Sequence, residues 1–231
     1  MALLDELEAA VAKIFADVWQ TRDGQKVPVS EDIQLGNHAV KLNATVLYAD
    51  LTASTPLVNA YKPEFAAEIY KTYLYSAARI IRSLGGAITS YDGDRVMAVF
   101  IGDGKNSAAA KCGLQINWAV KNIIQPALKN QYPKSTYAVR QVVGIDTSEL
   151  LVARTGIRGS NDLVWVGRAA NYAAKLSAES ADYPTWITSD VYSMLNESSK
   201  YGGNPRRDMW VRRNWASQRG YVYTSTYWWE I

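Results

Sequence analysis

The chain has 231 residues and a mass of 25.6 kDa, with 48% hydrophobic and 20% charged residues, which is typical of a folded protein and excludes a disordered one. Its 25 Lys and Arg against 22 Asp and Glu leave a net charge of +3, too small by itself to indicate a polyanionic partner. The single Cys112 excludes an internal disulfide, and the single His38 excludes a zinc site built from several His and Cys. Any chemistry must therefore come from carboxylates, hydroxyls, Lys, Arg and a hard metal ion.

Residues 1–19 carry apolar side chains at helical spacing between acidic ones, which predicts an amphipathic helix that packs on another surface. No apolar run reaches the roughly 20 residues that span a bilayer, and the first residues do not form a signal peptide. We therefore expect a cytoplasmic protein without a membrane partner. Residues 20–43 contain Gly and Pro without a sustained period and are predicted to be a linker, so that residues 44–231 form the main domain.

The main domain begins with a predicted strand at 44–49, which ends at Asp50 and is followed by the turn and helix-cap sequence LTAST. A helix is predicted from Pro63 to the Gly85-Gly86 pair. The runs AITSY and RVMAVFI flank Asp92-Gly93, which predicts a hairpin with positive φ at its turn.

The second half predicts a helix at about 106–129, two strands at 137–145 and 149–154 with a short break between them, and an Ala-rich helix within 164–180. The order β, helix, β, β, helix, β is that of an α+β, ferredoxin-like split β-α-β sheet with helices on one face. From residue 201 onward Arg, Trp and Tyr interleave, and VYTSTYWWE alternates like a strand. An aromatic C-terminal strand pair at the sheet edge accounts for this pattern without a nucleic-acid partner, which we do not expect.

Asp50 and Asp94 are the first candidates for chemistry. Asp50 ends a strand and Asp94 begins the strand after the hairpin turn. Because the first strand of a split β-α-β sheet lies beside that hairpin, the two carboxylates can meet at one edge. Carboxylate pairs without a nearby His suit Mg²⁺ or Mn²⁺, although turn formation alone also accounts for either Asp.

Three ordered motifs resemble those of class III nucleotidyl cyclases: YADLTAST at 48–55, SYDGDRVMAVF at 90–100 and GRAANYAAKL at 167–176. The resemblance covers roughly residues 44–190 and implies that 44–231 is a cyclase catalytic domain. In such a cyclase the ribose 3′-oxygen of a nucleoside triphosphate attacks the α-phosphorus and pyrophosphate leaves. Catalysis of this step is chiefly positioning and stabilisation of charge.

The resemblance also implies roles for individual residues. Asp50 and Asp94, with the Leu51 carbonyl, would hold two Mn²⁺ or Mg²⁺ ions per site, and Asn171 and Lys175 would orient the ribose and stabilise the transition state. The family usually has Arg where Lys175 stands, so the planar guanidinium is lost. Metal residues and the Asn/basic pair face each other across a head-to-tail dimer in this family, which predicts a homodimer with composite sites. The turn that would present backbone N–H groups to phosphate contains Thr52, Ser54 and Thr55.

The two positions that encode a purine in the family are Ser90 and Val164 here, and neither purine code is present. Tyr48 and Trp165 are bulky and narrow the pocket, and Arg95 only donates hydrogen bonds, which favours uracil. The pattern resembles the pyrimidine cyclases of bacterial Pycsar antiphage systems, whose cyclic nucleotide acts on a separate effector. UTP is the expected substrate, and CTP stays open. The expected base pocket comprises Tyr48, Ser90, Asp92, Arg95, Val164 and Trp165.

One position departs from the family: Glu149 stands where a phosphate-binding Arg is usual. The phosphate charge must then be balanced by another cation, and Arg140, Arg154, Arg168 and Lys62 are candidates. An inactive cyclase-like regulator that binds a nucleotide is a second hypothesis, which the presence of both aspartates disfavours. A nucleic-acid-binding module built on the C-terminal tail is a third.

Overall fold

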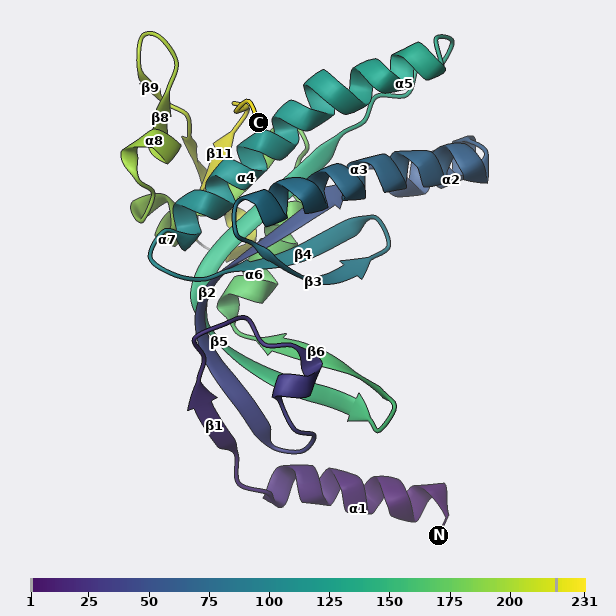
Figure 1. The fold of residues 1–231 in the computed structure, drawn as a ribbon, viewed down its shortest axis with the longest axis vertical. Coiled ribbons are helices and arrows are strands. Elements are labelled where there is room, and N and C mark those ends of the chain that lie inside the picture. The colour runs from purple at the N-terminus through teal and green to yellow at the C-terminus, as the bar shows by residue number, and fades with distance from the viewer. Residues whose placement is uncertain (1, 219) are drawn as a thin grey trace. The chain divides into compact units, whose positions relative to one another are not determined.

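The computed structural model describes residues 2–218 and 220–231 and divides the chain into two compact units (Figure 1). The first unit combines residues 1–43 with 149–167, and the second combines 44–148 with 168–231. Residues 149–167 form an antiparallel hairpin and group with the N-terminal residues in the first unit.

The second unit is built on a mixed sheet in the order β10-β11-β7-β5-β2-β4-β3. The hairpin β3-β4 pairs antiparallel with β2, and β5 runs parallel to β7. This arrangement confirms the predicted α+β class. The strands are β2 (His38–Leu51), β3 (Ala87–Asp92), β4 (Arg95–Phe100), β5 (Gln141–Ile157), β7 (Thr185–Thr188), β10 (Val211–Trp215) and β11 (Gly220–Ser225).

Helices pack on both faces of this sheet, and not on one face as we expected. Helices α3 (Pro63–Ser83) and α4 (Lys105–Ala119) lie side by side and share a core with Val143 of β5 (Figure 1). Leu176 of α6 (Arg168–Ser177) packs instead with Val142 and with Trp186 of β7. Because neighbouring strand residues point to opposite faces, α6 covers the other side.

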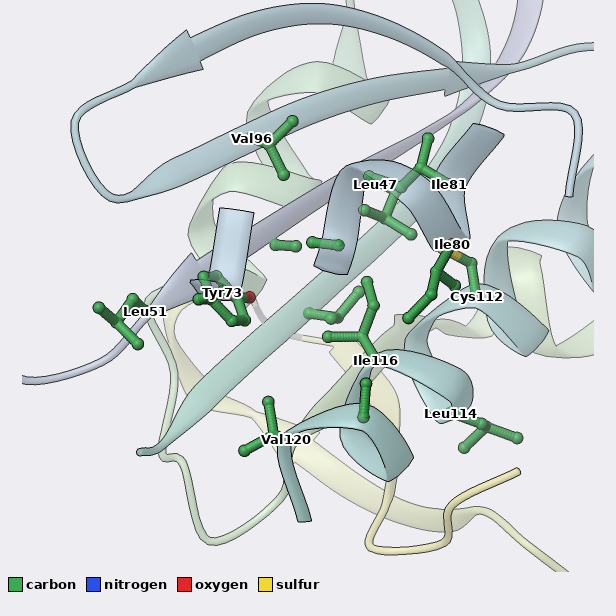
Figure 2. Close-up of a cluster of buried hydrophobic side chains, with 14 of the residues drawn as sticks. Leu47, Leu51, Tyr73, Ile80, Ile81, Val96, Cys112, Leu114, Ile116 and Val120 are labelled. Carbon is green, nitrogen blue, oxygen red and sulfur yellow. The ribbon is translucent and has the colours of Figure 1, made fainter. Parts of the chain in front are cut away.

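The core between α3, α4 and the sheet is apolar and closed. Figure 2 shows Leu47 and Val96 from the strands facing Ile80, Ile81 and other side chains from the two helices. Cys112 is completely buried there, and burial raises the pKa of its thiol. Tyr73 of α3 is also completely buried, close to the end of β2 that carries Leu51 (Figure 2).

Several strand predictions were wrong at their boundaries. β2 begins at His38, and the predicted linker contains β1 (Gln20–Asp23), which pairs with β2, and a short 3₁₀ helix η1 (Ser30–Asp32). β1 is exposed along its whole length, so it shows no apolar period. β5 continues without the predicted break and pairs with β6 (Ser160–Val166).

The predicted helix at 106–129 is three consecutive segments: α4, the π-helix η2 (Val120–Ile124) and α5 (Gln125–Gln131). Pro126 stands in the first turn of α5, where its missing N–H costs least. The remaining short elements are α2 (Ser54–Ala60), α7 (Ser189–Ser193), α8 (Glu197–Lys200), β8 (Tyr201–Gly202), β9 (Arg207–Asp208) and η3 (Ala216–Gln218).

The two chain ends differ from expectation. Helix α1 (Leu3–Ala16) forms as predicted, but none of its residues is buried, so the expected packing of its apolar face is not observed. The C-terminal strand pair β10-β11 is confirmed, yet β11 ends at Ser225, because the following backbone bonds to α4, with Trp229 donating to the Leu114 carbonyl at 3.2 Å. Within the described residues, no helix is long and apolar enough to cross a membrane.

Candidate active site

Asp50 and Asp94 are held together by the backbone of the β2-β4 ladder. Asp50 stands opposite Arg95, and the Leu51 amide donates to the Asp94 carbonyl oxygen at 3.2 Å. The hairpin turn is one residue later than we predicted: Asp92 pairs with Arg95, so the two turn residues are Gly93 and Asp94. Gly93 has a φ of +61°. Positive φ at the first turn position suits a tight hairpin and places Asp94 at its tip, beside the end of β2.

Both aspartates line one cavity of about 580 Å³ in the second unit. The cavity also takes in Leu51, Thr52 and Ser54, so the structure brings the expected metal residues and most of the expected phosphate turn together. Thr55 is exposed and outside the lining. The complete lining is Asp50, Leu51, Thr52, Ala53, Ser54, Asp94, Arg140 and residues 177–182.

The electrostatics of this cavity favour a cation. Burial, followed by the charge of Asp94, raises the pKa of Asp50 to about 6, and nearby Arg95 opposes the shift. The phenol oxygen of Tyr73 is buried without a hydrogen-bond partner among the described residues, and burial, with the charges of Asp50 and Asp94 among the smaller causes, raises its pKa. A carboxylate whose ionisation is disfavoured by burial and by a neighbouring carboxylate is stabilised in its charged form when a positive ion lies beside it.

The donor set fits a hard divalent ion. The described residues contain no cluster of three or more His, Cys, Asp and Glu side chains, so this site has two carboxylates and the Leu51 carbonyl to offer. Mg²⁺ is commonly bound by one or two carboxylates together with substrate phosphates and water. The cavity leaves space for such further ligands.

The turn after β2 is anchored to Arg140. The Thr52 amide donates to the Arg140 carbonyl at 2.9 Å, and Ala53 adopts a φ of +59°, which is unusual for a residue other than Gly. The guanidinium of Arg140 forms an ion pair with Asp182 at 2.8 Å, and both side chains are exposed. Of the four cations considered for phosphate, Arg140 is the one that lines the cavity.

The other three cations lie elsewhere. Arg154 donates to Asn161 in the first unit at 2.7 Å, and Lys62 caps the start of α3. Arg168 donates to Asp146 at 3.1 Å.

Asp182 is a cavity residue that the sequence does not identify by any motif. It is 42 residues from Arg140, and only the fold brings the two side chains together.

Asn171 and Lys175 are exposed on α6 and do not line the cavity that holds Asp50. They are four residues apart on the helix, as predicted. The Lys175 ammonium lies 5.7 Å from the ring centre of Tyr172. Within one chain, Asn171 and Lys175 therefore lie outside the cavity that Asp50 and Asp94 line.

The expected base pocket is assembled in part. The Arg95 guanidinium lies 5.6 Å from the ring centre of Tyr48 and donates from Nε to Asp92 at 3.1 Å. Burial raises the pKa of Tyr48. Ser90 pairs with Met97 in the same hairpin. Val164 and Trp165 belong to β6 of the first unit, where Trp165 stands opposite Val152.

Individual relatives place the chain in a family, although no family model matches the chain. It is 52% identical over the full length of both chains to a uridylate cyclase of Burkholderia cepacia, and 48% identical, again over both full lengths, to one of Xanthomonas perforans. A uridylate cyclase of Rhodovulum is 38% identical over 99% of this chain and 98% of its own.

The solved structures agree in fold. The adenylyl cyclase CyaB of P. aeruginosa has a TM-score of 0.69 at 20% identity, covering 81% of this chain and 95% of its own. The guanylyl cyclase Cya2 has a TM-score of 0.66 at 18% identity, covering 82% and 94%. The fold is that of the class III nucleotidyl cyclase domains. Within that class, the chain belongs to the uridylate cyclase family.

Proposed function

We propose that the chain converts UTP to 3′,5′-cyclic UMP and pyrophosphate by attack of the ribose 3′-hydroxyl on the α-phosphate. The observation that carries this proposal is the placement of Asp50 and Asp94 on one cavity in a member of the uridylate cyclase family. Two Mn²⁺ or Mg²⁺ ions, held by these carboxylates and the Leu51 carbonyl, would activate the 3′-hydroxyl and balance the triphosphate charge. The backbone pairing of Leu51 with the Asp94 carbonyl keeps the two carboxylates in place during the reaction.

Arg140 is the residue we assign to the triphosphate. It lines the same cavity as the aspartates and replaces the cation that the family usually has at the position of Glu149. Its guanidinium is paired with exposed Asp182, and such exposed pairs are weak. A triphosphate carries more negative charge than the Asp182 carboxylate and can therefore displace that carboxylate from Arg140. Ser54, with Thr55 beyond the lining, adds backbone N–H groups from the turn. The Thr52 amide already donates to the Arg140 carbonyl, so Thr52 contributes its side-chain hydroxyl instead.

Asn171 and Lys175 act in the cavity of a second copy. Their exposure on α6, outside the cavity of their own chain, supports a head-to-tail homodimer with two composite sites. The test is a mixed dimer, made by co-expressing Asp50→Asn and Asn171→Ala chains with different tags and purifying through both. One site of the mixed dimer is intact, so about half of the wild-type activity should return. Activity no higher than in the parent variants would contradict composite sites.

The base pocket is where UTP and CTP differ. Tyr48 and the Arg95–Asp92 pair lie together, and Arg95 can donate to a carbonyl oxygen but accept nothing. Uracil presents an oxygen where cytosine presents an amine, so this pocket favours UTP. Ser90, which lies in the same hairpin as Arg95, belongs to this proposed pocket. Replacement of Arg95 by Gln, which both donates and accepts, should narrow the ratio of kcat/KM for UTP over CTP. An unchanged ratio would remove Arg95 from base recognition.

The product is a second messenger in this proposal, acting on a separate effector in cytoplasmic antiviral defence. Its support is the resemblance of the chain to Pycsar pyrimidine cyclases. Cells that express the chain with its effector should resist phage, and cells with the Asp50→Asn chain should not. Equal resistance in both would contradict a signalling role for the product.

A further inference from the structure

An ion pair between the completely buried Asp146 and the partly exposed Arg168 lies at the start of helix α6, outside the cavity lined by Asp50 and Asp94. Asp146 of β5 is completely buried, and its carboxylate accepts from Thr188 Oγ1 at 2.5 Å and from Arg168 Nε at 3.1 Å. Arg168 Nη2 also donates to the Thr147 carbonyl at 2.8 Å and contacts the carboxylate of Asp190. The guanidinium of Arg168 is thus fixed from several sides.

Arg168 is the first residue of α6, so the pair fixes the start of that helix. The next amide, that of Ala169, donates to Ser148 Oγ at 3.0 Å. Further along, α6 rests directly on β5 at Gly144, where an added Cβ would lie 2.2 Å from the Ala173 carbonyl oxygen. Helix α6 therefore contacts β5 near both of its own ends.

The same helix face leads from Arg168 to Lys175. The guanidinium of Arg168 and the ammonium of Lys175 each lie 5.7 Å from the ring centre of Tyr172, which packs edge-on against Trp215 at 5.1 Å between ring centres. Residues 168, 172 and 175 are stacked because side chains three and four apart share one helix face. The orientation of Lys175 therefore depends on the orientation of Arg168.

Stability alone is a poor reason for such a pair. Desolvation of the buried Asp146 carboxylate is costly, and the Arg168 side chain is 42% exposed, so that solvent weakens the attraction between the two charges. A guanidinium fork with fixed hydrogen-bond directions does, however, determine geometry in a way that apolar packing does not.

We propose that Arg168, held by the buried carboxylate of Asp146, is a positioning residue that orients Asn171 and Lys175 toward the reacting nucleotide in the partner's site. The inference rests on the proposed composite site. It assigns a function to a charged pair that lies outside the cavity lined by Asp50 and Asp94.

The first test is steady-state kinetics of the full-length Arg168→Lys enzyme with UTP and Mn²⁺. Lys keeps the positive charge beside Asp146 but loses the fork. We expect kcat to fall about tenfold or more, with KM for UTP within about twofold, because the lost interaction orients transition-state groups. The matched control is Arg206→Lys, at the exposed Arg206–Glu197 pair of 2.7 Å, which should leave kcat unchanged. A wild-type kcat in Arg168→Lys, or a loss confined to KM, would overturn the proposal.

The second test uses mixed dimers to ask which half of the site is damaged. Combined with Asp50→Asn, which supplies an intact α6, the Arg168→Lys chain should regain about half of the wild-type kcat, because one wild-type site results. Combined with Asn171→Ala, it should not. A structural defect of the whole chain would be rescued by neither partner, and that result would overturn the positioning role.

Asp146→Asn is a second variant, because the Asn side chain has nearly the same shape as Asp. It should likewise be rescued by Asp50→Asn and not by Asn171→Ala. If Asp50→Asn and Asn171→Ala fail to complement each other, the composite site itself fails and this inference fails with it. If they complement each other and Asp50→Asn does not rescue Arg168→Lys or Asp146→Asn, the positioning role alone fails. The two outcomes are therefore distinguishable.

Discussion

The amide of Leu51 donates a 3.2 Å hydrogen bond to the carbonyl oxygen of Asp94, and this contact joins the end of β2 to the tip of the β3-β4 hairpin. Asp50 precedes Leu51 and faces Arg95 across the ladder. Backbone pairing, and not the carboxylates themselves, therefore holds the two acids side by side. Either carboxylate can be replaced without removing the hydrogen bonds that position it.

Replacement of Asp50 or Asp94 by Asn should reduce the rate of pyrophosphate release from UTP by at least about 100-fold, since an amide does not supply the charge that holds a divalent ion. The fold should be retained, which circular dichroism will show. Asp103→Asn, an exposed position in the loop after β4, is the matched control and should be fully active. Substantial turnover by either active-site variant would argue against metal binding there.

The metal-free protein should lose stability as pH rises toward neutrality. The pKa of Asp50 is raised from 3.8 to about 6 by burial and by Asp94, so its protonated form is the one that the fold favours. The contribution is fully present below pH 3.8 and is lost as pH rises to about 6. Thermal melts with EDTA should show a flatter profile for Asp50→Asn than for wild type over this range. Added Mn²⁺ should stabilise wild type above pH 6 and have little effect on the variant. Parallel profiles would contradict the shift.

Replacement of Arg140 by Ala should weaken product inhibition by pyrophosphate. A hydrogen bond to a charged group contributes about 1.5–3 kcal/mol, which corresponds to roughly 10- to 100-fold in the inhibition constant. Asp182→Asn frees Arg140 from its ion pair and should strengthen the same inhibition or leave it unchanged. An inhibition constant unaffected by Arg140→Ala would exclude Arg140 from phosphate binding.

Replacement of Tyr73 by Phe should stabilise the metal-free protein by about 1 kcal/mol, because it removes a buried hydroxyl without a partner among the described residues. Tyr192→Phe is the contrasting variant, since that hydroxyl donates to Asp208, and its removal should destabilise. Urea denaturation of the two variants measures both effects. Destabilisation by Tyr73→Phe would show that the hydroxyl is hydrogen-bonded in the folded protein.

Much of the fold could be predicted because the second unit follows simple periodic rules. The stripe on α3 identifies a helix that buries one face, the continuous apolar run of β4 identifies a strand that is buried on both faces, and Gly93 marks the hairpin. β1 escaped prediction because an exposed strand is ordered by backbone pairing alone. The break expected within β5 was absent because its polar residues Asp146 and Thr147 are buried within the strand and form hydrogen bonds there.

The site likewise contains some residues that the sequence predicts and others that only the fold brings together. Asp50 and Asp94 could be expected together because strand order places one end of β2 beside the hairpin. The Arg140–Asp182 pair and the Asp146–Arg168 pair join residues 42 and 22 positions apart, respectively, and a single sequence contains no local pattern for either. Four candidate cations could be named from the sequence, but only packing determined which of them lines the cavity.

Incubation of the purified protein with ATP, GTP, CTP and UTP together in the presence of Mn²⁺, with the products identified by mass, tests the central claim most directly. The account predicts 3′,5′-cyclic UMP as the main product, formed with an equal amount of pyrophosphate and absent with Asp50→Asn. A cyclic purine as the main product, or nucleotides that remain uncyclised, would contradict it.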